Sequence, residues 1–177
     1  MAILSTAEWL QSAPLATAIR ESGLPYPIIM ALHLTGMALF GGLILITDLR
    51  LLGVAMRELS IADVVGGLRN WKRIGFVWVA TCGALLAWSE AEKYSGNPYF
   101  WIKMTLLVLV AVHAIIFRPR VYNHPEKLDL EPRIPTRAKA AAILSLLLWS
   151  GLVCAGRWIG YYEGPRPSGA VTQASFK

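Results

Sequence analysis

An apolar run that begins near Pro27 and continues through Ile46 constrains this chain more than any other feature. Its length suffices for a helix to cross the hydrocarbon core of a bilayer, which takes about 20 residues. The run carries one ionisable side chain, His33, near its start, and it is closed by Asp48 and Arg50. Lipid cannot solvate an imidazole. A histidine in such a run is therefore expected to face other helices of a bundle and to serve a function there.

Three further apolar runs follow along the chain. Of the 177 residues, 55% are hydrophobic and only 16% are charged, whereas a soluble domain carries about 25% charged residues. We therefore predict an all-α, polytopic membrane protein with a four-helix transmembrane bundle. The expected spans are about 27–46, 74–88, 99–117 and 138–159. Cys82 and Cys154 fall inside apolar runs, so no disulfide framework is implied.

The two ends of the chain differ from the spans. Residues from about 5 to 22 are apolar on one side but too short and polar to span, which predicts an N-terminal interfacial amphipathic helix, bent at Pro14. Residues 1–163 form a single expected membrane domain. The Pro, Gly and Ser-rich residues 164–177 are predicted to be a flexible tail. No secretory signal peptide is expected, because the first strong apolar run starts late and no basic region precedes it.

Basic residues gather in the connections 48–73 and 118–139, and the opposite side holds fewer. The positive-inside rule then places both termini on the non-cytoplasmic side of a bacterial inner membrane. In a membrane protein, the net charge of +6 does not imply that the chain binds nucleic acid. The expected partners are membrane lipid and either a quinone or a larger membrane complex, and an oligomer stays open. Asp48 and Arg50 are expected to pair on one helix or to contact another subunit.

Two histidines, His33 and His113, lie within predicted spans. Neutral imidazoles on facing helices are the usual way in which a bundle holds a b-type haem, and both are candidate metal ligands. The alternative for each is a hydrogen bond across the bundle. The glycines beside His33 would admit either a flat macrocycle or a closely packed helix. They are Gly36, Gly41 and Gly42.

The two histidines are not expected at one depth. His33 comes 7 residues after the interfacial Tyr26, and His113 comes 12 after Trp101, on spans that run in the same direction. At 1.5 Å per residue this is an offset of about 8 Å. One haem bridging both would need a strong tilt. Otherwise each ring pairs with a methionine, a carboxylate or a second haem.

A polar cluster is expected at the outer ends of the spans. Glu90 and Glu92 close the second span, Lys103 opens the third, and Arg157 lies in the last turn of the fourth. Ionisable groups with aromatic walls suit a quinone head group, a proton relay or a haem propionate. The alternative is snorkelling and ion pairing at helix ends, which we favour for Glu92. Glu90, Lys103 and Arg157 are therefore candidate cofactor-binding residues.

Two stretches resemble known haem-associated membrane proteins. One has a histidine, an aromatic residue next to glycine about two turns on, and an arginine at the helix end. This stretch is Ala31-Leu32-His33 through Phe40-Gly41-Gly42-Leu43 to Arg50. It resembles the first helix of the copper-resistance D proteins and of the HemJ-type protoporphyrinogen oxidases. The stretch from Trp101-Ile102-Lys103 to His113 resembles a later helix of the HemJ type. The whole chain, with its segment 88–94, is similar to an uncharacterised bacterial four-helix membrane family. The resemblance implies a haem b with His33 as ligand and with His113 and Lys103 as accompanying residues.

Two functions follow from these features. The first is a b-type haem-binding or quinone-linked electron-transfer subunit, with His33 as the favoured axial ligand. The alternative is a non-enzymatic membrane anchor or structural subunit of a larger complex. Transport of a small solute or metal is the weakest hypothesis, because four short spans leave little room for a pathway. The sequence has no CxxC, HExxH or Gly-rich phosphate loop, so it assigns no catalytic residue and leaves enzyme activity open.

Overall fold

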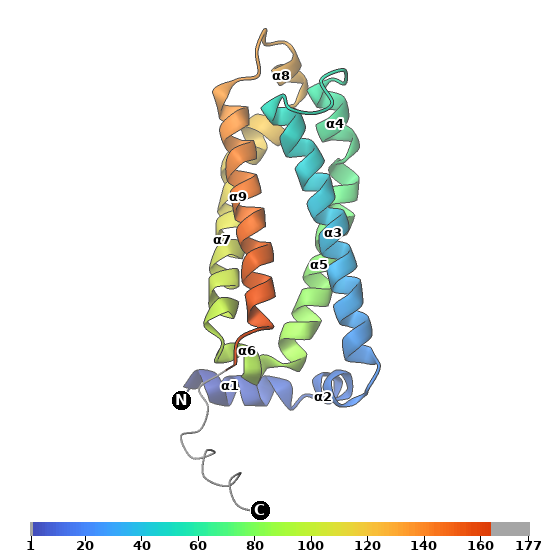
Figure 1. The fold of residues 1–177 in the computed structure, drawn as a ribbon, viewed down its shortest axis with the longest axis vertical. Helices are drawn as coiled ribbons and strands as arrows, with labels where there is room; N and C mark the ends of the chain where they lie inside the picture. The colour runs from blue at the N-terminus through green and yellow to red at the C-terminus, as the bar shows by residue number, and fades with distance from the viewer. Residues whose placement is uncertain (1, 164–177) are drawn as a thin grey trace, which may run out of the picture.

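The computed structural model describes residues 2–163, and this part of the chain is built of helices without strands. Four long helices stand side by side (Figure 1). They are α3 (Pro25–Leu52), α5 (Arg69–Ser89), α7 (Pro98–Phe117) and α9 (Thr136–Ile159). The all-α prediction is confirmed, and each predicted span lies inside one of these helices. The predicted tail, 164–177, lies outside the described residues.

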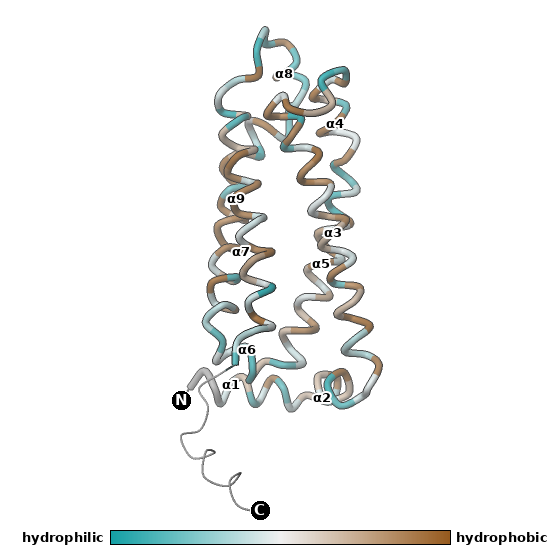
Figure 2. The backbone as a smooth tube through the Cα atoms, in the orientation of Figure 1, coloured by the Kyte–Doolittle hydropathy of each residue, from teal (hydrophilic) through white to brown (hydrophobic). Residues whose placement is uncertain are grey.

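Three of the long helices, α3, α7 and α9, are long and apolar enough to cross a membrane. Apolar residues predominate along them in Figure 2. α5 is less apolar, because Arg69, Lys72 and Arg73 charge its first turns. The membrane class of the protein therefore rests on three helices.

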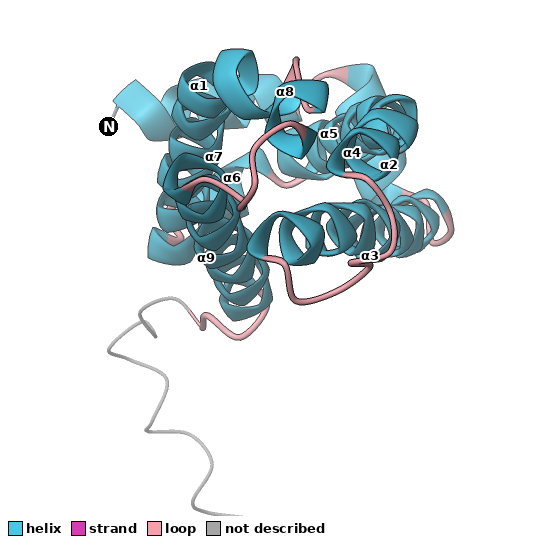
Figure 3. Ribbon diagram, turned by 90° about the horizontal axis from the view of Figure 1, so that it is seen from above, coloured by secondary structure: helices cyan, strands magenta, loops and turns pink. Residues whose placement is uncertain are grey.

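The four long helices pack as two pairs joined through α3 and α9. α3 packs along α5, α7 packs along α9, and α3 also contacts α9. α5 and α7 do not pack against each other in this way. Figure 3 shows the two pairs from above. The short α6 (Ala91–Ser95) links α5 to α7 at the base.

Helix ends follow local chemistry. α3 ends at Gly53, which adopts the left-handed region with φ of 73° and donates its N–H to the Arg50 carbonyl. α7 opens with Pro98, as its sequence predicts. The preceding Asn97 is 2% exposed. Its Oδ1 accepts from the Tyr99 N–H at 3.0 Å, and its Nδ2 donates to the Ile159 carbonyl at 3.1 Å. This one side chain therefore ties the start of α7 to the end of α9.

The opposite end of the bundle is closed by three short elements. They are α4 (Ile61–Gly67), the π-helix η1 (Arg118–Tyr122) and α8 (Glu126–Asp129). Apolar side chains from these elements and from the adjoining ends of α3 and α9 form the buried core. The core residues are Leu51, Ile61, Val65, Val121, Leu128, Ala138, Ala141 and Ala142. The bundle is therefore packed most tightly at this end.

Two side chains cap α4. Ser60 Oγ accepts from the Asp63 N–H at 2.9 Å, as a serine at a helix start commonly does. The Asp129 carboxylate of α8 accepts from the N–H groups of Ile61 and Ala62, at 2.7 and 2.8 Å. The second cap joins segments 68 residues apart, so the sequence pattern alone does not reveal it.

The N-terminal segment forms two helices where one bent helix is expected from the sequence. α1 (Ala2–Gln11) ends before Ala13, which is extended, and Pro14 opens α2 (Pro14–Glu21). Proline has no N–H and disfavours helix in the residue before it, so it starts a helix here instead of bending one. Both helices lie across the base of the bundle (Figure 1).

We expect Gly41→Ala to destabilise the bundle. A Cβ at Gly41 would lie 2.8 Å from Cε2 of Trp149, so the indole or a helix must shift. Overpacking of this kind costs about 1–3 kcal/mol. Unfolding in detergent, followed by circular dichroism, measures the loss. Gly42→Ala is the matched control, because nothing lies within 4 Å of its added Cβ. Equal losses in the two variants would contradict this account of the packing.

Candidate functional site

His33 lies on the inward face of α3 and is 7% exposed. Its ring packs against α5, where a Cβ on Gly83 would lie 2.9 Å from the ring Cε1. The backbone of Val79 interacts with the same ring. His33 Nδ1 is buried and has no hydrogen-bond partner. A buried polar atom is normally paired, so this nitrogen is a candidate hydrogen-bonding group for a ligand.

Lys103, in the second turn of α7, lies near His33. Its charge acts on the His33 imidazole. Its Nζ lies 3.6 Å from the place of a Cβ on Gly156 of α9, so this glycine leaves room for the ammonium. Within residues 2–163, no hydrogen bond or ion pair engages the ammonium. The structure thus brings together two of the predicted site residues, and each has unused hydrogen-bonding capacity.

The glycines beside His33 serve mainly for packing. A Cβ at Gly36 would lie 3.1 Å from Cγ2 of Val79, and Gly41 faces the Trp149 indole. Gly42 faces open space. Of the two uses expected from the sequence, close packing is the one present at Gly36 and Gly41.

His113 lies apart from His33. Its ring is 8% exposed, and Nε2 lies 3.0 Å from the Ala141 carbonyl in the first turns of α9. Ten residues separate it from Lys103, which is about 15 Å along α7. The hydrogen bond across the bundle, one of the two expected uses of this histidine, is therefore present.

Glu90 and Arg157 lie near the base of the bundle, and no interaction described above joins either of them to His33. Glu90 is half-buried where α5 ends and α6 begins, and its charge acts on Tyr94. Arg157 is exposed, donates to the Tyr161 hydroxyl and lies 4.6 Å from the centroid of that ring. Arg157 thus has the snorkelling arrangement that was the alternative for such residues.

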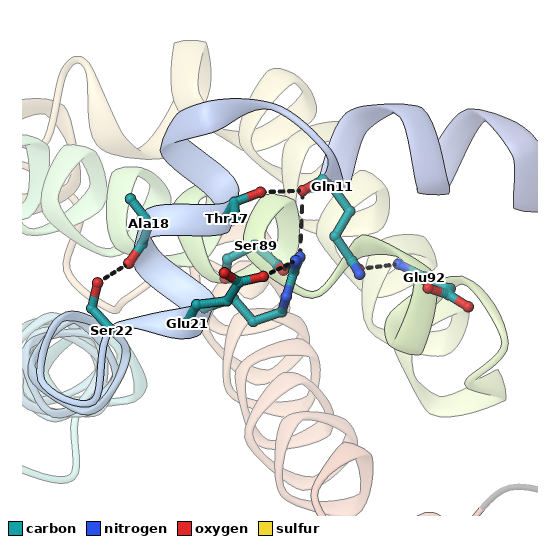
Figure 4. A network of polar contacts seen from close by, with 8 residues as sticks. Gln11, Thr17, Ala18, Glu21, Ser22, Ser89 and Glu92 are labelled. Atoms are coloured by element: carbon teal, nitrogen blue, oxygen red, sulfur yellow. Dashed lines mark hydrogen bonds and ion pairs between the residues drawn. The ribbon is translucent and has the colours of Figure 1, made fainter.

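The base also holds polar contacts that the sequence did not indicate (Figure 4). Arg20 donates to the carbonyls of Gln11 and Ser89, at 3.3 and 3.4 Å, and pairs with Glu21 at 3.2 Å. Gln11 Oε1 accepts from the Glu92 N–H at 3.0 Å. These bonds fasten α1 and α2 to α5 and α6.

An apolar cavity of 630 Å³ lies beside these contacts. Its walls come from α1, the end of α5, α6 and the start of α7, and they include Trp88, Tyr94, Phe100 and Trp101. Burial, followed by the Tyr26 hydroxyl at 3.0 Å, raises the pKa of Tyr94, so the phenol stays protonated. Phe100 and Trp101 lie in the first turn of α7, just before Lys103, and neither Lys103 nor His33 lines the cavity.

A second interior polar group lies at the other end of the bundle. Asp48 is 1% exposed and interacts with Lys72, Tyr122 and Ser145. The expected pair between Asp48 and Arg50 is not formed, because Arg50 donates its Nε–H to the Leu59 carbonyl at 2.9 Å. The partners of Asp48 come from three other elements, so local spacing did not indicate them.

No group of three or more His, Cys, Asp or Glu side chains that could hold a metal ion lies within residues 2–163. The fold and the site together define a helical membrane protein with an inward-facing histidine and lysine. The chain belongs to a family of unknown function, DUF6644, whose model matches residues 8–162. No curated protein and no solved structure matches it.

We expect His113→Phe to lower stability by about 0.5–1.5 kcal/mol, the net contribution of one hydrogen bond. Phenylalanine keeps the packing against Phe117, whose ring lies 4.9 Å away, and removes only the bond to Ala141. Unfolding in detergent measures the change. His124→Gln, at an exposed histidine, is the control. A His113→Phe variant as stable as the control would show that the bond contributes nothing.

Proposed function

We propose that this chain is an integral membrane subunit of an electron-transfer system in which His33 and Lys103 bind the head group of a quinone. The unpartnered Nδ1 of His33 beside an unengaged ammonium carries the proposal. A quinone carbonyl oxygen has two lone pairs and can accept from both groups. The apolar cavity near the start of α7 supplies a surface that an isoprenoid tail could contact.

A b-type haem with His33 as axial ligand is the second candidate, favoured by the same free nitrogen. When bound, haem would supply one-electron transfer. The residues fit in part, since His33 Nδ1 can ligate iron and Lys103 suits a propionate. However, Val79 and Trp149 fill the glycine faces that would admit the flat macrocycle. A quinone needs no such face, so it fits the site better.

The proposal includes the membrane arrangement. α5 is the fourth span, α1 and α2 lie in the interface, and the base of the bundle with both termini faces away from the cytoplasm of a bacterial inner membrane. Support comes from charge, because the α4 and α8 end carries most of the lysines and arginines. Buried Asn97 and the Arg20 contacts tie the base together, as an interfacial layer requires.

Cysteine labelling tests this topology. In a variant with Cys82→Ala and Cys154→Ala, we expect a membrane-impermeant maleimide to label Lys93→Cys from outside intact cells. Glu58→Cys should react only after permeabilisation. Both parent side chains are exposed: Glu58 lies in the loop before α4, and Lys93 lies on α6, which follows α5. Labelling of both cysteines from the same side would mean that α5 does not cross the membrane.

Quinone binding tests the function. Purified protein in nanodiscs is titrated with decylubiquinone while tryptophan fluorescence is recorded. Loss of one hydrogen bond to a charged group should weaken binding about tenfold to a hundredfold in Lys103→Met, and His33→Ala should weaken it as well. Lys93→Met, an exposed lysine near the same end, is the control.

An absorption spectrum after haem-replete expression separates the two ligands. A Soret band lost in His33→Ala would select haem over quinone. Unchanged quinone affinity in both variants, together with no Soret band, would reject both ligands. A co-purifying complex that survives His33→Ala would then favour the anchor function.

A further inference from the structure

Asp48 forms a second site, which does not depend on the ligand at His33. Its carboxyl is 1% exposed, and its Oδ2 has no hydrogen-bond partner. Four elements meet around it: α3 itself, α5 through Lys72, η1 through Tyr122, and α9 through Ser145. A buried ionisable group with one unpaired oxygen is expected to bind a ligand through that oxygen.

The neighbouring cation does not close an ion pair with this carboxylate. Lys72 donates to Thr47 Oγ1 at 3.1 Å, and within residues 2–163 no contact of 4.0 Å or less joins it to Asp48. Thr47 in turn donates to the Leu43 carbonyl at 2.8 Å. A buried pair that served only structure would gain most by closing. Here the carboxylate keeps a free oxygen instead.

The other charged and titratable groups narrow the choice of occupant. Lys72 and Arg69 place positive charge on the α5 side, and Arg69 donates to the Tyr122 carbonyl at 2.8 Å. The His113 ring lies 6.3 Å from the Tyr122 ring on the α7 side. A metal cation needs several ligand atoms, and no group of three or more His, Cys, Asp or Glu side chains that could hold one lies within residues 2–163. A proton needs a single oxygen, so it is the occupant that this site accepts best.

Two of the residues that interact with Asp48 lie at the edge of the bundle. Lys72 and Tyr122 are both partly exposed, whereas Asp48 is closed off. The Lys72 ammonium lies 5.8 Å from the centroid of the Tyr122 ring. Burial, and then the Asp48 charge, raise the pKa of Tyr122, so its hydroxyl remains a protonated donor beside the carboxylate.

We infer that Asp48 is a proton-binding site that exchanges with the aqueous face at the α4 and α8 end through Tyr122 and Lys72. Uptake forms one O–H bond at Oδ2 with a proton from water, and release breaks that bond. Uptake neutralises the negative charge of the Asp48 carboxylate, and no other reactant is needed.

Infrared spectroscopy of the full chain in nanodiscs tests this inference. We expect a carboxylic-acid carbonyl band that disappears as the pH rises, because the protonated carboxyl alone gives this band. Labelling with 13C-aspartate should shift the band. Asp48→Asn should abolish it, and Asp63→Asn, at an exposed aspartate, should leave it unchanged.

Two further variants keep the test decisive if Asp48→Asn fails to fold. Tyr122→Phe and Ser145→Ala each remove a hydroxyl that interacts with the Asp48 carboxyl. Each should move the midpoint of the band to higher pH, because a group that stabilises the carboxylate is lost. No titrating band in the wild type, a band that survives Asp48→Asn, or midpoints unmoved in both hydroxyl variants would overturn the inference.

Discussion

Lipid offers no hydrogen bonds, and this constraint orders the whole structure. A polar side chain within an apolar helix must turn toward protein or toward an end of the bundle. His33, Asp48 and His113 are each less than a tenth exposed. Their apolar neighbours Leu34 and Ile115 are 59% and 74% exposed. The usual pattern of a soluble bundle is thus reversed, which is the arrangement expected of helices surrounded by lipid.

α3 is the element on which both interior sites depend. It packs against α5 and against α9, and it carries both His33 and Asp48. These residues are 15 positions apart, about four turns or 22 Å, so they lie near one face of the helix. Gly36 and Gly41 lie between them and admit side chains from α5 and α9. The face that holds the bundle together therefore also carries its ionisable groups.

The helices could be predicted because apolar run length and local caps determine them. Pro98 in the first turn of α7 and Ser60 at the N-cap of α4 are residue types that commonly begin helices. The break at Pro14 was harder to predict. In the sequence of a short amphipathic segment, a proline that starts a new helix cannot be told from a proline that bends a continuous one. The surroundings of Asp48 were not predictable. Tyr122 and Ser145 come from other elements, and sequence periodicity does not fix how helices rotate against one another.

Packing explains why the two interior sites suit ligands of different size. The Asp48 end lies under the buried apolar core, where Leu51 and Val121 are both 0% exposed, so little beyond a proton fits there. α5 and α7 contact each other less than the other neighbouring long helices do, and toward the base a 630 Å³ apolar cavity adjoins the start of α7. Lys103 lies at this more open end, and its charge acts on His33. The proposed head group at one end of α3 and the proposed proton at the other end are both argued from this uneven distribution of side-chain volume along the bundle.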